Sequence, residues 1–216
     1  MLACAVNTYG SNIERKLIVG GDVVPANTKT YMTGLRATIG GNSLCGGSLI
    51  SPTHVLTASH CVGYDIRWAS IGSHFRNGTQ NSEQIRVISI MNHPNYSENV
   101  LFSDDFLVLE LAKPSSFKPV KLAAADDSDF KAGKWATTMG WGTNVETNGT
   151  YPDSGGPLIM ESSTEGNSTE DVLVGVVSWS KDNTCAREGY YGVYSRVSSV
   201  RAWIDSITGG NGTCLS

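Results

Sequence analysis

Short apolar runs separated by turn residues are the pattern that most constrains the fold of this 216-residue chain. Runs of this length, bounded by Gly, Pro, Asn and Asp, are typical of β-strands. The 24 glycines suit the tight turns and corners of a barrel. The sequence therefore predicts an all-β domain, with strands over residues 32–39, 44–49, 54–58, 66–71, 84–90, 106–111, 134–141, 157–160, 172–179 and 192–197.

One helix is expected near the C-terminal end, capped by Ser198 or Ser199. Four apolar residues recur there with the spacing of one helical face: Val200, Trp203, Ile204 and Ile207. The polar segment 161–171 is predicted to be a surface loop. Residues 113–131 are rich in Pro, Ser, Ala and Asp, and they are predicted to link two β lobes.

Three residues suited to acyl transfer occur in the order His60, Asp105, Ser154. Such a reaction needs a base for the hydroxyl proton, an acid that orients the base, and donors that meet the oxyanion. The order His–Asp–Ser excludes the α/β-hydrolases, in which the order is Ser–Asp–His. This order predicts a nucleophilic serine.

The flanks of these residues resemble those of the trypsin-like serine proteases. The matching motifs are IVGG at 18–21, LTASHC at 56–61, DDFLVLEL at 104–111, MGWG at 139–142, DSGGP at 153–157 and VSWS at 177–180. Other stretches, such as NHPNYS and VKLAAADDSD, resemble secreted trypsin-like proteins of plant-pathogenic water moulds. That group includes glucanase inhibitor proteins, which are protease homologues that lost catalysis and bind host glucanases.

The resemblance implies a chymotrypsin-like double β-barrel over residues 18–216, preceded by a propeptide remnant at 1–17. The first barrel would span about residues 30–112 and the second lobe about 132–216. His60 would be the general base, Asp105 would orient it, and Ser154 would be the nucleophile. The resemblance implies no metal or cofactor. It further implies that Asp153 pairs with the amine of Ile18 after activation, and that the substrate is bound by Ser178, Trp179, Ser180 and Gly192.

The resemblance breaks immediately before the nucleophile. Only ten residues separate Gly142 from Asp153, whereas the family has several dozen there, including two strands of the second barrel and the base of the S1 pocket. Pro152 replaces a Gly whose N–H faces the oxyanion, and proline has no N–H. We therefore expect an internal deletion, a second barrel that does not close, and edge strands at 134–141 and 192–197.

Cysteines and sequons indicate a secreted, extracellular glycoprotein. Cys45 and Cys61 are spaced as a disulfide, whose closure would stabilise the fold by ~3 kcal/mol. Cys185 lacks its family partner, and Cys4 and Cys214 have no obvious mate. Five N-x-S/T sequons occur, at Asn77, Asn95, Asn148, Asn167 and Asn211. The start MLACAVNTYG is too short an apolar run for a signal peptide.

The net charge of -4 argues against nucleic acid as a partner. No run reaches the ~18 apolar residues of a membrane span, so no membrane partner is expected. Three functions stay open. The first is an endopeptidase that acts on protein or peptide substrates and is impaired by the deletion. The second is an inactive homologue that inhibits a host glucanase, and the third is a non-functional product of a mis-predicted gene.

Overall fold

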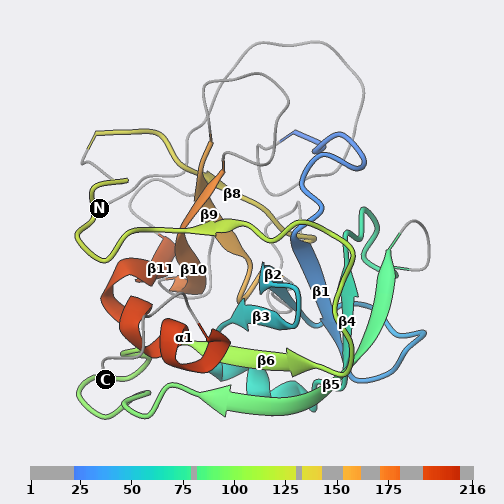
Figure 1. Ribbon diagram of the computed structural model, residues 1–216, viewed down its shortest axis with the longest axis horizontal. Helices are drawn as coiled ribbons and strands as arrows, with labels where there is room; N and C mark the ends of the chain where they lie inside the picture. Colours follow the sequence, from blue (N-terminus) through green and yellow to red (C-terminus); the bar gives the residue numbers. More distant parts are fainter. Residues whose placement is uncertain are drawn as a thin grey trace.

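The computed structural model describes residues 22–78, 82–129, 133–142, 153–161, 171–180 and 192–209. Within these residues the regular secondary structure is mostly β (Figure 1). The strands are β1 (Met32–Arg36), β2 (Cys45–Ser51), β3 (His54–Thr57), β4 (Trp68–Ile71), β5 (Glu83–Asn92), β6 (Leu107–Leu111), β7 (Lys121–Leu122), β8 (Thr137–Thr138), β9 (Pro157–Met160), β10 (Val172–Ser180) and β11 (Gly192–Arg196). The helices are the 3-10 helices η1 (Ser59–Tyr64) and η4 (Val197–Val200) and the α-helix α1 (Arg201–Thr208).

Strands β1 to β6 form a closed barrel in the order β1-β2-β3-β6-β5-β4, and every pair is antiparallel. Closure leaves the barrel no unpaired edge. Its interior is filled by branched apolar side chains, including Leu35, Leu49, Leu56, Ile71 and Leu109, all fully buried. The first barrel therefore confirms the expected β lobe, with strand ends shifted by a few residues from the predicted ones.

Among the residues that the structure describes, the remaining strands form a five-stranded sheet that does not close. Its order is β11-β10-β9-β8, and β7 pairs in parallel with β10. Among the described residues β8 does not pair with β11, so both are edge strands, as expected. Two expectations were wrong. The strand expected over 134–141 is only the two residues of β8, and the expected linker contributes β7, a fifth strand where four were expected.

The C-terminal helix forms where its apolar spacing predicts it, but its predicted cap is wrong. The N-cap of α1 is Val200, which has no side chain that could form a capping hydrogen bond and is also the last residue of η4. The Ser198 hydroxyl instead donates to a carboxylate oxygen of Asp127, and the Ser199 hydroxyl donates to a backbone carbonyl. Gly209 ends the helix with a φ of 64°, a conformation that glycine adopts without a steric penalty.

An ion pair with one buried member, Asp171, joins the segment before β1 to the second sheet. Lys29 Nζ lies 2.7 Å from Asp171 Oδ2 and 2.9 Å from Glu161 Oε1. The Tyr31 hydroxyl donates to the same Asp171 oxygen at 2.7 Å. Asp171 is only 2% exposed, so its placement in a surface loop was wrong. Its carboxylate tolerates burial because a cation and a hydroxyl both meet it.

None of the described helices is long and apolar enough to cross a membrane.

Candidate active site

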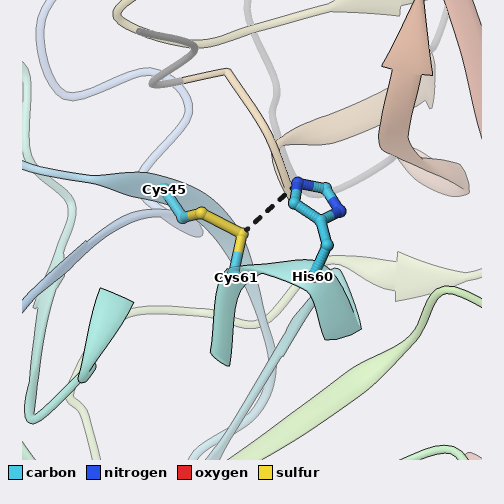
Figure 2. A group of neighbouring side chains, drawn as sticks. All are labelled: Cys45, His60 and Cys61. Atoms are coloured by element: carbon cyan, nitrogen blue, oxygen red, sulfur yellow. Dashed lines mark hydrogen bonds between the residues drawn. A yellow bond between two sulfur atoms is a disulfide. The ribbon is translucent and has the colours of Figure 1, made fainter. Parts of the chain in front are cut away.

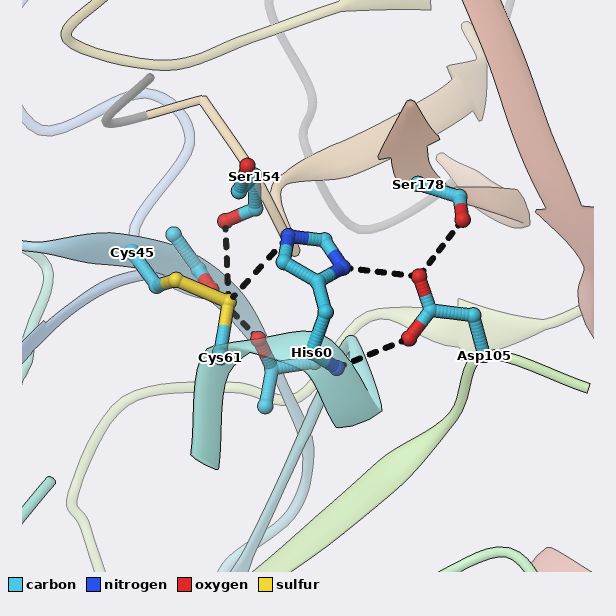
Figure 3. Close-up of a disulfide and its surroundings, with 8 residues drawn as sticks. Cys45, His60, Cys61, Asp105, Ser154 and Ser178 are labelled. Carbon is cyan, nitrogen blue, oxygen red and sulfur yellow. Dashed lines mark hydrogen bonds and ion pairs between the residues drawn. A yellow bond between two sulfur atoms is a disulfide. The ribbon is translucent and has the colours of Figure 1, made fainter. Parts of the chain in front are cut away.

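His60 and Asp105, the predicted base and its orienting acid, lie at the same end of the antiparallel pair β3–β6 in the first barrel, where Thr57 pairs with Leu107. His60 lies in η1, directly after β3, and Asp105 lies two residues before β6. The His60 Nδ1–H donates to Asp105 Oδ2 at 2.7 Å, and the His60 backbone N–H donates to Oδ1 at 2.9 Å (Figure 3). Asp105 is fully buried, whereas the His60 side chain is 17% exposed. The imidazole is therefore held with Nε2 available as a proton acceptor.

The second sheet supplies a further donor to Asp105. The Ser178 hydroxyl, on β10, donates to Asp105 Oδ2 at 2.5 Å (Figure 3). Sequence reasoning assigned Ser178 to the substrate pocket and missed this contact. A sequence signal for it exists, because Ser178 continues the every-second-residue spacing of the apolar Val174 and Val176 and so shares their face of β10. A hydroxyl at an inward position needs a buried partner.

The nucleophile turn, residues 153–156, is fixed by backbone hydrogen bonds. The Ser154 carbonyl accepts from the Gly46 N–H of β2 at 2.8 Å, and the Gly156 N–H donates to the Asp153 carbonyl at 2.8 Å. Gly155 has a φ of 77°, and a side chain there would overlap Thr57. Glycine is therefore required at this corner of the turn.

Within the described residues, no hydrogen bond joins the Ser154 hydroxyl to His60 Nε2. That nitrogen instead lies 3.9 Å from Cys61 Sγ, and the same sulfur lies 3.7 Å from the Ser154 carbonyl oxygen (Figure 3). The structure thus brings His60, Asp105, Ser154 and Ser178 together. The hydrogen bond that would activate the serine is not formed.

Asp153, next to Ser154, is half-buried. Its Oδ1 accepts a hydrogen bond from the Gly142 N–H at 2.6 Å. Burial raises the pKa of this carboxyl from 3.8 to about 6, against the opposing effects of the Gly142 N–H and the Arg76 charge. Ile18 lies outside the described residues, so its pairing with Asp153 stays a prediction.

The other predicted binding residues are placed only in part. Trp179 is 43% exposed, and Gly192 of β11 pairs with Ser180 of β10. The sequon residues Asn77 and Asn95 are exposed, as glycosylation would require. Pro152, Cys185 and the remaining sequon residues, Asn148, Asn167 and Asn211, lie outside the described residues.

The predicted disulfide is present, and it rules out one alternative site. Cys45 and Cys61 are bonded, with an S–S distance of 1.99 Å. Their sulfurs lie within 4.8 Å of a His60 ring nitrogen, an arrangement similar to a metal site (Figure 2). Both sulfurs are consumed by the disulfide, so neither is a thiolate that could bind a metal.

Comparison with known proteins yields two kinds of match. Residues 18–153 and 149–204 match the family model described as Trypsin. Glucanase inhibitor protein 3 of Phytophthora infestans is 42% identical over 95% of this chain and 94% of its own length. Glucanase inhibitor protein 2 of Phytophthora sojae is 38% identical over 96% of this chain and 84% of its own. Trypsin 5G1 of Aedes aegypti is 31% identical over 89% of this chain and 85% of its own length.

The alignments also bear on the expected deletion. The alignment with the first of these relatives extends over 248 residues, which is longer than the whole 216-residue chain. That relative therefore has residues without a counterpart here. The two segments that match the family model meet at 149–153, immediately before Ser154. This is the place where the spacing of Gly142 and Asp153 predicts a gap.

Proposed function

Since the chain belongs to the trypsin family, we propose that it is a secreted, catalytically impaired member that binds and inhibits a glucanase. Relatives that carry the name glucanase inhibitor protein align with 92–97% of this chain at 37–42% identity. The disulfide and the exposed sequon residues Asn77 and Asn95 support an extracellular site of action. A trypsin-family fold that has lost hydrolysis still offers a folded binding surface.

One observation carries this proposal: in the described part of the chain, the Ser154 hydroxyl makes no hydrogen bond to His60 Nε2, although His60 is held in place by Asp105. A serine is a weak nucleophile unless a base lies within hydrogen-bond reach. Pro152, two residues before Ser154, has no N–H for an oxyanion. Losing one such donor lowers kcat by ~10²–10³ in a related mechanism.

A second function, a slow serine endopeptidase, is favoured by a separate observation. The buried Asp105 accepts three hydrogen bonds, two from His60 and one from Ser178. These contacts orient an imidazole as a general base requires. In this alternative, His60 accepts the Ser154 proton once a peptide substrate brings the two groups together.

The test combines an inhibition assay with a chemical probe. Purified protein is added to a panel of glucanases, and release of reducing sugar from a glucan is measured. We expect one or more enzymes to be inhibited, and Ser154→Ala to inhibit equally because binding needs no nucleophile. A fluorophosphonate should label Ser154 far more slowly than it labels trypsin. Rapid labelling that Ser154→Ala abolishes, with every glucanase unaffected, would instead establish the endopeptidase.

A further inference from the structure

We propose that Trp141 is a positioning residue, which links the nucleophile turn to residues 73–78 of the first barrel, here termed the 73–78 loop. Trp141 follows β8 in the second lobe, whereas the 73–78 loop follows β4 in the first. The inference goes beyond the proposed function, because it concerns what fixes residues 153–156 whether Ser154 reacts or not.

The first link runs from the 73–78 loop to the indole. The Trp141 Nε1–H donates to the His74 carbonyl oxygen at 3.1 Å. The indole ring is half-buried and packs against the hydrophobic core. It also lies against β1, because a Cβ added at Gly34 would be 3.5 Å from the ring. The ring is therefore fixed by packing on one side and by a directional hydrogen bond on the other.

The second link runs from the two glycines that flank Trp141 to the carboxyl group of Asp153. The Gly142 N–H donates to Asp153 Oδ1 at 2.6 Å. A Cβ added at either Gly140 or Gly142 would overlap this carboxyl group. The carboxyl therefore lies directly against the backbone on both sides of Trp141. A displacement of Trp141 would therefore move both the Gly142 N–H and the backbone against which the Asp153 carboxyl group packs.

The third link is covalent, since Asp153 immediately precedes Ser154. The main chain of the turn is held from β2, where the Gly46 N–H meets the Ser154 carbonyl. The Asp153 side chain, in contact with residues 140–142, supplies a second fixed point. Two fixed points on either side of Ser154 define the direction of its backbone, and Trp141 maintains one of them.

The 73–78 loop is itself rigid enough to serve as the base of this chain of contacts. The Arg76 carbonyl accepts from the Ser43 backbone N–H at 3.0 Å and from the Ser43 hydroxyl at 3.1 Å. The Phe75 carbonyl accepts from the Gly78 N–H at 2.8 Å and from the Ser73 hydroxyl at 2.6 Å. Contacts inside the first barrel thus set where the His74 carbonyl lies.

The experiment is NMR of Trp141→Phe, which keeps an aromatic ring against β1 and removes the N–H. Hydrogen exchange of the Gly142 and Gly156 amides should become about 5–10-fold faster, since one hydrogen bond is lost. Titration of the Asp153 carboxyl should move to higher pH by about 0.5–1 unit, because the weakened Gly142 N–H bond no longer favours the ionised form. Arg76, the charged group facing this carboxyl, is the same in both proteins.

Trp203→Phe is the matched control, because this half-buried indole contacts His93 and belongs to α1. It should leave the Gly142 exchange rate and the Asp153 titration unchanged. The proposal fails if Trp141→Phe behaves like wild type, or if exchange also accelerates throughout β5 and β6, which would indicate global destabilisation. If Trp141→Phe does not fold, Ser43→Ala tests the same chain of contacts. Unaltered exchange at Gly142 in that variant would overturn the proposal.

Discussion

Replacing Asp153 by Asn should stabilise this protein, and the effect should depend on pH. Burial raises the pKa of the Asp153 carboxyl from 3.8 to about 6. One pKa unit corresponds to about 1.4 kcal/mol, so ionisation costs the native state about 3 kcal/mol at most. Asn is isosteric and can still accept the Gly142 N–H bond, but it carries no charge that burial would penalise.

The sign of the pH dependence follows from the direction of this pKa shift. Between about pH 3.8 and pH 6 the native carboxyl keeps a proton that the unfolded chain has released. Wild-type stability therefore falls as the pH rises through this window. The free energy of unfolding of Asp153→Asn should equal that of the wild type at pH 3.5 and exceed it by about 1–3 kcal/mol at pH 8.

Urea unfolding of both proteins between pH 3.5 and pH 8, with the disulfide intact, measures this difference. The transition must be two-state for the free energies to be compared. A variant that is less stable than wild type at pH 8 would refute the reasoning. That result would mean that an ammonium group, such as the amine of Ile18, pairs with the ionised carboxylate.

Three further outcomes are expected in equilibrium unfolding measurements. Lys29→Met should lower the free energy of unfolding by about 3–5 kcal/mol, because it leaves the buried carboxylate of Asp171 without its cation. Lys121→Met removes an exposed ion pair and should cost under about 1 kcal/mol. Equal losses in the two variants would contradict this expectation. Ser178→Ala should cost about 1.5–3 kcal/mol through the lost hydrogen bond to the buried Asp105 side chain, and a neutral result would show that the bond contributes nothing. Reducing the disulfide of the first barrel should cost about 3 kcal/mol, and peptide mapping that finds both thiols free in oxidised protein would contradict the pairing.

The first barrel could be predicted from the sequence because the patterns that indicate its strands and motifs lie within short stretches of the chain. The turn residues that bound each apolar run mark the strand ends, and the residues around His60 and Asp105 carry a recognisable motif. Even so, the base–acid contact depends on the antiparallel pairing of β3 with β6, from His54–Glu110 to Thr57–Leu107. The motif predicts the partners of this hydrogen bond, and the pairing of the strands brings them within 2.7 Å.

The second lobe was harder to predict because its elements depend on distant partners. Strand β7 is only two residues long, and it is a strand because it pairs in parallel with β10. No propensity of Lys121 or Leu122 signals such a pairing. The contact between Ser178 and Asp105 likewise joins residues 73 positions apart. The helix cap was mispredicted because Ser198 lies within η4, before the N-cap residue Val200, and its hydroxyl donates to the carboxylate of Asp127.

The division of the site between a closed barrel and an open sheet has an evolutionary consequence. The barrel holds His60, Asp105 and the disulfide, and its ring of strands is complete without the second sheet. A gene that loses the codons between Gly142 and Asp153 therefore still encodes one intact lobe and the C-terminal helix. Hydrolysis can be lost in a single genetic event while most of the outer surface survives. Natural selection can then act on that surface as a recruited scaffold, free of the demands of turnover.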